Sequence, residues 1–279
     1  MRGLDLKPRI GGGPFRSKKG RILFVCYYDP NFIATVVENI GMWQRLSGYD
    51  LAIFNLWPNR NPLLTLPASL DLKEFDGVIV HSTACYAFAN LQSLDTRLST
   101  RFVDYDGVKV LMKQDEQVKP GRVARYLGEN KFDLLITCMP EAEVRKVYAA
   151  DVVGRDLAFL HAYTGYISPA QHDLWQRYRT SERSIDISYR GSVQPLETSR
   201  LGFEKRKVGY DVAALPHRPG TRIDISSRNE DRIGGVAWFN FLASSKVVLG
   251  VESGSNLFDF EGDVEAWCRD YAARNADAD

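Results

Sequence analysis

The chain has 279 residues, which is enough for about two domains of ordinary size or one large domain. Its residues are 44% hydrophobic and 25% charged, close to the average of soluble globular proteins, which excludes extensive intrinsic disorder. Thirty-six Lys and Arg against 35 Asp and Glu give a net charge of +1, which excludes a global electrostatic preference for nucleic acid or anionic lipid.

The first 20 residues are predicted to form a flexible basic leader. They hold six Lys or Arg, one acidic residue, two prolines and a run of three glycines. The glycine run precedes the first apolar segment, whereas a dinucleotide-binding fingerprint follows a strand and opens a helix. The leader is therefore not interpreted as a nicotinamide site.

Six strongly apolar segments, separated by helix-like segments, occupy the next part of the chain. Continuously apolar strands are buried on both faces, and helix-sized spacers between them indicate parallel crossover connections. The pattern predicts the α/β class with a doubly wound parallel sheet, and an eight-stranded barrel remains the competing geometry. The predicted strands are 21–26, 50–56, 76–81, 107–112, 132–138 and 155–162.

A polar helix-like segment begins at Ser168, and a domain boundary is expected near residues 165 to 182. Beyond it, strands are predicted at 183–192, 222–227 and 246–251, with helices at 231–245 and about 263–274. Three strands are fewer than an open α/β sheet usually has. We expect a leader (1–20), a Rossmann-like domain (21–180) and an incomplete second Rossmann-like domain (181–279).

Polar residues at the ends of the first strands are candidates for chemistry, because ligands bind outside the carboxyl ends of strands in open α/β sheets. His81 and His161 each end a predicted strand, where an imidazole can contact an acceptor or transfer a proton, and Asp115 follows the strand 107–112. A structural histidine is the alternative interpretation. Asp104 and Asp106 precede a strand, which is the wrong end for a metal site, so no metal is expected.

The second part of the chain holds the sharpest local signal, the sequence ESGSN at residues 252–256 directly after an apolar strand. A carboxylate beside small residues, whose N–H groups can turn toward a ligand, suits an anion or a sugar diol. The alternative is a turn in which Gly254 supplies a positive φ and Ser253 or Asn256 caps the next segment. Arg190 and Lys205 are candidate phosphate ligands, with solvated surface charge as the alternative.

Several motifs that would indicate other classes of function are absent from the sequence. No P-loop, no G-x-S-x-G elbow and no G-x-G-x-x-G after a strand occurs in the sequence. Four widely spaced cysteines argue against a disulfide scaffold and structural zinc, and three of them fall in or just after apolar runs, where a buried thiol is expected. With no apolar run of membrane-spanning length and no signal-peptide core, a cytoplasmic location is expected.

Several segments together resemble one protein family. They are KVLMKQDEQ, LLITC, HAYTGYIS, IDISYRG, LGFEKRKVG and, most specifically, AWFNFLASSKVVLGVESGSNLFDFEGD. They resemble bacterial glycosyltransferase-like proteins of the GT-B type, which occur in polysaccharide gene clusters and are related to spore-maturation-type glycosyltransferases. The resemblance covers about residues 21–263. It implies two facing Rossmann-like domains, with the acceptor mainly on the first and a nucleotide-diphosphate sugar mainly on the second.

The resemblance also implies roles for individual residues. His81, Asp115 and His161, the candidate catalytic residues, would belong to the first domain's side of the cleft between the two domains. Cationic side chains and helix N-termini would stabilise the leaving diphosphate without a metal, and no cofactor besides the donor substrate is implied. The residues that would contact the donor are Arg190, Gly191, Lys205, Glu252, Ser253, Gly254, Ser255 and Asn256.

In one respect the sequence departs from this family. Proteins of that family continue with a further helix, a second acidic residue at the donor site and a terminal part that closes the second sheet and crosses back to the first domain, whereas this sequence ends at Asp279. Two hypotheses follow. The chain is a sugar-transferring enzyme or a fragment of one, or it is a non-catalytic Rossmann-like module that binds a partner or self-associates through an exposed edge of its second sheet.

Overall fold

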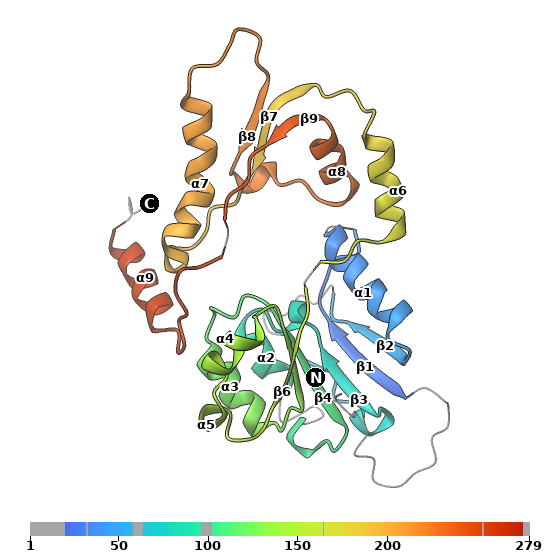
Figure 1. Cartoon of the computed structure of the whole chain (residues 1–279). Coiled ribbons are helices and arrows are strands. Elements are labelled where there is room, and N and C mark those ends of the chain that lie inside the picture. Colours follow the sequence, from blue (N-terminus) through green and yellow to red (C-terminus); the bar gives the residue numbers. More distant parts are fainter. Residues whose placement is uncertain are drawn as a thin grey trace. The chain divides into compact units, whose positions relative to one another are not determined.

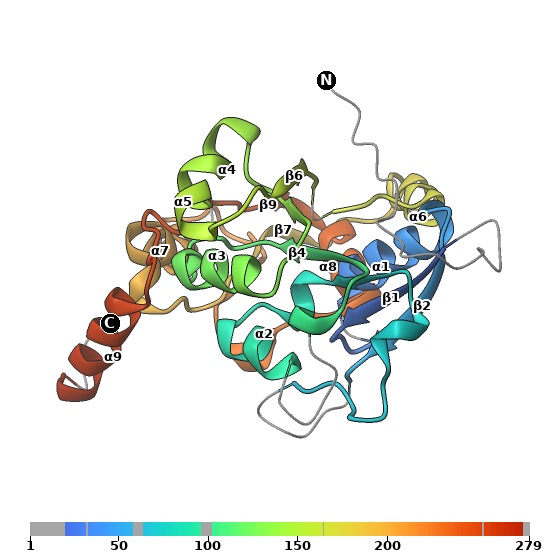
Figure 2. The same cartoon turned by 90° about the horizontal axis from the view of Figure 1, so that it is seen from below.

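The computed structural model describes residues 20–31, 33–57, 64–95, 102–163, 165–252 and 254–275 (Figures 1 and 2). Residues 1–19 of the predicted leader and Ser253 of the predicted donor segment lie outside the described residues. The chain divides into two compact units. Unit 1 comprises residues 1–29 and 35–166, and unit 2 comprises residues 30–34 and 167–279.

Unit 1 is built on an open, parallel, six-stranded sheet in the order β2-β1-β3-β4-β5-β6. This confirms the predicted α/β class and the parallel sheet, and it rules out the barrel, because no pairing between β2 and β6 closes the described sheet. The strands are β1 (Arg21–Cys26), β2 (Asp50–Asn55), β3 (Gly77–Val80), β4 (Val108–Lys113), β5 (Leu134–Thr137) and β6 (Ala158–His161).

Helices cover the two faces of this sheet unequally. One core packs the strands against α2, α3, α4 and α5, and the other packs them against α1. Successive side chains alternate between the faces, so that Leu111 joins the first core and its neighbour Val110 the second. Figures 1 and 2 show α1 apart from the other four helices. The helices are α1 (Ala34–Leu46), α2 (Phe88–Leu94), α3 (Pro120–Glu129), α4 (Glu141–Val147) and α5 (Ala150–Val153).

Strand order explains this asymmetry. The chain moves in one direction along the sheet from β1 to β2 and in the opposite direction from β3 to β6. Because parallel crossovers are right-handed, α1 lies on one face and the helices that follow β3, β4 and β5 lie on the other. Within the described part of unit 1, α1 is therefore the one helix that packs on its face of the sheet.

Unit 2 contains a parallel three-stranded sheet in the order β8-β7-β9. Its strands are β7 (Ile185–Arg190), β8 (Ile223–Ser226) and β9 (Ser245–Val248). Its helices are α6 (Pro169–Tyr178), α7 (Ser199–Ala214), α8 (Gly235–Ala243) and α9 (Asp263–Arg274), and Figure 1 shows α7 running alongside the strands. Both sheets are consistent with Rossmann-like folds. The segment of α6 was predicted to belong to the first domain (21–180), whereas its contacts place it in unit 2.

Short 3-10 helices connect several of these elements. They are η1 (Leu72–Glu74), η2 (Ser82–Ala84), η3 (Phe102–Asp104), η4 (Leu196–Thr198) and η5 (Asn229–Asp231). Two of them, η2 after β3 and η4 before α7, stand at carboxyl ends of strands and shape the sites described below. In the described part of the chain, no helix has the length and apolar character needed to cross a bilayer.

Candidate functional site

In unit 1, polar groups gather at the carboxyl ends of β1 and β3, where strand order reverses direction. This reversal is the topological switch point, the usual position of a ligand in open α/β sheets. The Tyr27 N–H donates to Thr83 Oγ1 at 3.0 Å, and the His81 N–H donates to the Val25 carbonyl at 2.8 Å. These hydrogen bonds fix the loop after β1 against η2.

His81 is the central side chain of this loop and is only 4% exposed. Its Nδ1 lies 2.9 Å from Thr83 Oγ1 and 3.3 Å from the Thr83 N–H, and its Nε2 lies 3.2 Å from Asn39 Oδ1. The neutral tautomer with its proton on Nε2 satisfies all three contacts, since Nδ1 then accepts and Nε2 donates. Burial lowers the pKa of His81 to about 4, which favours this neutral form. Its predicted part in catalysis stays a prediction, and its contacts give it a structural role.

The buried His81 ring makes stability depend on pH. Its pKa is about 4 in the folded protein and near 6.5 when unfolded, so the unfolded chain binds more protons between these values. We expect the free energy of unfolding to fall by about 2 kcal/mol between pH 7 and pH 5 from this group. Urea unfolding at both pH values should show a smaller fall in His81→Gln. His172→Gln, which changes an exposed histidine, should retain the wild-type fall, and equal falls in all three proteins would contradict the assignment.

The other two predicted catalytic residues of unit 1 lie along the same edge. Asp115 follows β4 in a left-handed conformation, with a φ of 58°. His161 ends β6 on the surface, and its Nε2 lies 3.1 Å from the Cys138 carbonyl. Among the described residues, no hydrogen bond joins His81, Asp115 and His161 to one another. The structure thus brings them to one edge of the sheet but not into direct contact.

A buried polar cluster next to Asp115 was missed by the sequence analysis. Lys113 and Glu116 are 3% and 5% exposed. The Lys113 ammonium donates to the Tyr86 carbonyl at 3.2 Å, and the Thr137 hydroxyl donates to the Glu116 carboxylate. Burial raises the pKa of Glu116, although the Thr137 hydrogen bond opposes that shift. In the sequence, the sign of this cluster was the position of KQDE directly after the predicted strand 107–112. The sequence alone does not show which of the two carboxylates in KQDE turns inward.

In unit 2, the residue after β7 must be glycine for the strand to approach α7. A Cβ on Gly191 would lie 3.0 Å from the Lys205 carbonyl of α7 and 2.7 Å from the Tyr189 ring. The Tyr189 hydroxyl donates to the same Lys205 carbonyl. This contact holds the end of β7 against the first half of α7.

Asn256, the last residue of the ESGSN segment, lies at the first turn of α7. Asn256 Oδ1 accepts a hydrogen bond of 3.1 Å from the Leu201 N–H, one of the donors that a helix leaves unpaired at its start. Gly254 has a φ of 109°, which confirms the positive φ expected in the alternative, whereas Asn256 caps the earlier helix α7 and not the segment that follows it. The Ser255 hydroxyl accepts a hydrogen bond of 3.1 Å from the Leu257 N–H. Glu252 is exposed beside this turn. The structure therefore brings Asn256 of ESGSN to the beginning of α7.

Arg190 has a well-defined structural environment. Its side chain is 15% exposed, and its Nη2 donates to Asp224 Oδ1 at 2.7 Å. Further donors reach the carbonyls of Asp231, Tyr189 and Asp224, and the guanidinium lies 4.5 Å from the centre of the Phe241 ring on α8. Since Tyr189 faces α7, the next side chain along the strand lies on the opposite face. The structure thus does not place the Arg190 side chain with α7, and its phosphate role stays a prediction.

Lys205 differs from Arg190 because no protein group in the described part of the chain engages its charged group. It is half-buried on α7, and within the described part of the chain its ammonium has no hydrogen-bond or ion-pair partner. A partly buried, unpaired ammonium retains its capacity to bind an anion. Of the two predicted cations, Lys205 is therefore the one with donors free.

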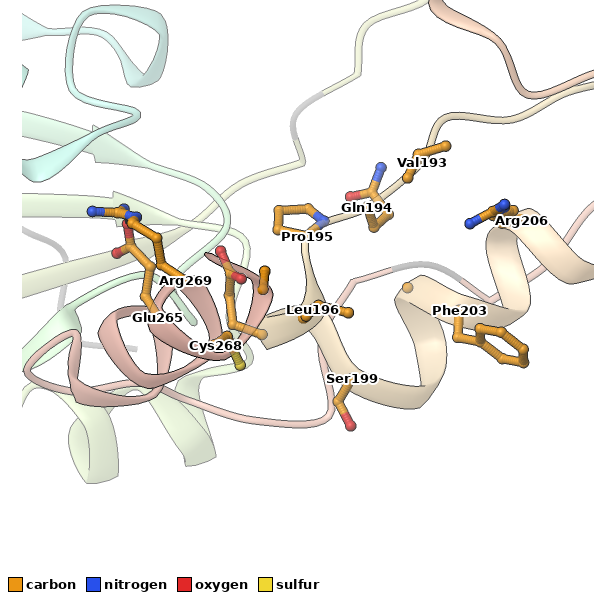
Figure 3. A pocket seen from close by; sticks show the side chains of 13 residues that line it. Val193, Gln194, Pro195, Leu196, Ser199, Phe203, Arg206, Glu265, Cys268 and Arg269 are labelled. Atoms are coloured by element: carbon orange, nitrogen blue, oxygen red, sulfur yellow. The ribbon is translucent and has the colours of Figure 1, made fainter. Parts of the chain in front are cut away.

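A cavity of about 720 Å³ adjoins the first turn of α7, a volume in the range of small-molecule sites. Figure 3 shows the loop residues Gln194, Pro195 and Leu196 between Phe203 and Arg206 of α7 on one side and α9 on the other. On α9, Arg269 is paired with Glu265. None of these lining residues was a predicted site residue, because α7 could not be predicted and its residues could not be placed around a common cavity.

Among the described residues, no three His, Cys, Asp or Glu side chains form a group able to hold a metal ion. Comparisons with models of known protein families, with curated proteins and with solved structures give no match. Function is therefore inferred from the fold, from the geometry of the two strand edges and from the motifs quoted above.

Proposed function

We propose that the protein is a GT-B-type glycosyltransferase, or part of one, that moves a sugar from a nucleotide-diphosphate donor to a glycan or related acceptor. The proposal assigns it to polysaccharide synthesis. The observation that carries it is the hydrogen bond between Asn256 Oδ1 and the Leu201 N–H at 3.1 Å. This bond joins the most specific motif of the resemblance, ESGSN, to the start of a 16-residue helix that follows a parallel strand.

Three groups support binding of a diphosphate at this position in unit 2. The first turn of α7 presents the positive end of the helix dipole, while its Leu201 N–H is held by Asn256 Oδ1. Gly191 allows the end of β7 to approach α7 without a side chain between them. The Lys205 ammonium has no partner among the described residues and supplies a full positive charge. Together they suit a diphosphate better than any one of them does.

The transfer itself needs charge stabilisation and a proton acceptor. As the bond between the anomeric carbon and the diphosphate oxygen breaks, negative charge develops on the leaving diphosphate, where Lys205 and the start of α7 would stabilise it. The acceptor hydroxyl forms the new bond to that carbon and gives its proton to a base. In unit 1, Asp115 is proposed as that base, with His161 as a contact of the acceptor, because both lie at the carboxyl edge of the sheet.

A non-catalytic interaction module is the second candidate, and one observation favours it. Within the described residues, β9 pairs with β7 on one side only, and Val247 and Val248 are 52% and 42% exposed. An uncovered apolar edge strand favours pairing with another chain. This candidate predicts a concentration-dependent oligomer and no release of nucleotide diphosphate from any donor sugar, and detectable transfer or donor hydrolysis would exclude it.

Lys205→Ala tests the donor site. A charge-assisted hydrogen bond contributes about 1.5 to 3 kcal/mol, so the variant should bind UDP or GDP at least about tenfold more weakly than the wild type. Affinity is measured by thermal shift and isothermal titration with both nucleotides and their sugars. Lys207→Ala is the matched control, because Lys207 lies on the same helix but pairs with Asp211. Equal affinity of the two variants, or no nucleotide that stabilises the wild type, would refute the proposal.

A further inference from the structure

Two exposed aromatic rings lie at the carboxyl edge of the sheet in unit 1. Trp57, which follows β2, and Tyr86, which follows η2, are 41% and 53% exposed. At the amino edge of the same sheet, the rings of Phe75, Tyr105 and Phe132 are buried just before β3, β4 and β5. Because ligands bind at the carboxyl edge of such sheets, and because hydrated aromatic surface is unfavourable, the two exposed rings are candidate ligand contacts.

Printed contacts connect these two rings into one row across the strand ends. The Tyr27 ring lies 5.6 Å from the Trp57 ring, edge to face, and the Tyr27 N–H donates to Thr83 of η2 at 3.0 Å. Tyr86 follows η2, and its carbonyl accepts from the Lys113 ammonium at the end of β4. The row therefore runs from the end of β2 to the end of β4.

The Asn55 side chain holds the loops after β1 and β2 together. Its Oδ1 accepts from the Tyr28 N–H at 3.1 Å and from the Trp57 N–H at 3.2 Å. Its Nδ2 donates to the Tyr28 carbonyl at 3.0 Å. The backbone that carries Trp57 is thus fixed before a ligand arrives, and a preorganised surface loses less conformational entropy on binding.

Polar groups with unused hydrogen-bonding capacity accompany the row. Within the described residues, no hydrogen bond or ion pair engages the Trp57 indole N–H, the Tyr86 hydroxyl or the side chains of Gln114, Asp115 and Gln117. The last three follow β4 and are half-buried. Burial, and to a smaller extent the Asp115 carboxylate, raise the pKa of the Tyr86 phenol, so this carboxylate lies within electrostatic reach of the exposed ring.

This combination of groups matches the surface of a carbohydrate. A sugar ring has an apolar C–H face, which packs against an aromatic ring, and a rim of hydroxyls, which pair with amides, carboxylates and indole N–H groups. A purely apolar molecule would instead cover Gln114, Asp115 and Gln117 without supplying partners, which costs free energy.

The charge of the row disfavours an acidic sugar. Asp115 contributes a carboxylate, whereas Lys113 is only 3% exposed and its ammonium already donates to the Tyr86 carbonyl. An anionic sugar would meet the Asp115 carboxylate without an accessible ammonium from Lys113 to offset the repulsion. A neutral carbohydrate avoids this cost.

The length of the row favours several linked sugars over one. Strands β2 and β4 stand three positions apart in the order β2-β1-β3-β4. Neighbouring strands lie about 4.8 Å apart, so the two strand ends are separated by roughly 14 Å. This span exceeds the width of one sugar ring and suits an oligosaccharide.

We propose that the acceptor of the sugar transfer is a neutral oligosaccharide that lies across the carboxyl ends of β2, β1, β3 and β4. Its sugar rings pack on Trp57 and Tyr86, and its hydroxyls pair with Gln114, Asp115 and Gln117. This assignment rests on the proposed function, which puts the acceptor on this edge of unit 1, and it adds the chemical class of the acceptor.

Isothermal titration of the full chain with four hexasaccharides tests the assignment. At least one of the neutral probes maltohexaose, cellohexaose and chitohexaose should bind saturably, and the anionic hexagalacturonate should bind at least tenfold more weakly than that probe. No binding of the three neutral probes at millimolar concentrations, or hexagalacturonate binding as tightly as they do, would overturn the assignment.

Titration with UDP and GDP separates this assignment from the proposed function. Nucleotide binding without hexasaccharide binding would overturn the acceptor class alone. Hexasaccharide binding without nucleotide binding would refute sugar transfer and would support this edge as a glycan-binding surface.

Three substitutions locate the hexasaccharide. Trp57→Ala and Tyr86→Leu should each weaken its binding about fivefold or more, because each removes one stacking ring. Tyr86→Leu retains the main-chain carbonyl that accepts from Lys113, so it tests the site even if circular dichroism shows that Trp57→Ala does not fold. Tyr49→Ala is the matched control, since Tyr49 is 47% exposed at the amino edge, and its affinity should stay within twofold of the wild type. Unchanged affinity in Tyr86→Leu, or equal weakening in Tyr49→Ala, would contradict the site.

Discussion

Gly128→Ala is expected to lower the free energy of unfolding of unit 1 by about 3 kcal/mol, since forcing extra atoms into a packed contact costs this much when neighbours cannot move. Gly128 lies on α3 where it meets α5, and a Cβ there would stand 1.7 Å from the Val153 carbonyl oxygen. That oxygen belongs to the backbone, so the two helices must separate. Urea unfolding, with hydrogen exchange of residues 120–129 as a local probe, measures the loss.

Gly41→Ala is the matched control for that result. Gly41 also lies inside a helix, α1, but a Cβ there would meet only the end of the flexible Arg45 side chain, at 2.9 Å. Since alanine has the higher helix propensity, this variant should be stabilised by about 0.5 to 1 kcal/mol. Similar stabilities of the two variants would show that α3 and α5 do not approach as closely as described.

Arg190→Ala is expected to destabilise unit 2 by about 2 kcal/mol, because it removes a mostly buried guanidinium, breaks its ion pair with the partly exposed Asp224 and leaves carbonyl acceptors without a donor. The guanidinium joins β7 to Asp224 of β8, to the Asp231 carbonyl and to the Phe241 ring. Hydrogen exchange of residues 185–190 and urea unfolding measure the effect.

Arg200→Ala separates this role from that of a surface ion pair. Arg200 pairs with Glu204 along α7, but its side chain is 80% exposed, so its loss should change stability by less than about 0.5 kcal/mol. At temperatures where Arg190→Ala remains folded, its nucleotide affinity should match the wild type. A stable Arg190→Ala protein that no longer binds nucleotide would instead show that the guanidinium faces the ligand.

The apolar strands could be predicted from the sequence because a strand that is buried on both faces needs apolar residues at nearly every position. Phe24 and Leu111 are fully buried from opposite faces of one sheet, and such strands read as continuous apolar runs. The turn at Gly254 was likewise predictable, because its positive φ favours glycine. At these positions, the local sequence was sufficient to predict the local structure.

Helix α7 could not be predicted from the sequence. Without this helix, the candidate donor residues could not be assigned to one place in the fold. Its sequence contains Gly202 and Gly209, which lower helix propensity, and its apolar residues form no clear stripe. The glycines are required by packing, since a Cβ at Gly209 would stand 3.0 Å from both Ile225 and Tyr189. Tertiary contacts thus override local propensity here.

The structure was also needed to determine which of two neighbouring charged residues has its side chain in the interior. Asp115 was selected after β4, whereas the side chain that turns into the interior is that of Glu116, held by Thr137 from β5. The positive φ of Asp115 reverses the local direction of the chain, and strand alternation does not predict such a reversal. Likewise, nothing in the sequence near Arg190 indicated that Asp224 would engage it from the neighbouring strand.

Amide chemical shifts during titration with UDP and GDP test the central proposal most directly. If unit 2 binds a nucleotide diphosphate at the start of α7, the Gly191 and Leu201 amides should shift saturably with one nucleotide, at a common dissociation constant. Lys205→Ala should raise that constant, whereas Lys207→Ala should not. Saturable shifts confined to other residues, or no shifts at millimolar concentrations of either nucleotide, would contradict the proposed donor site.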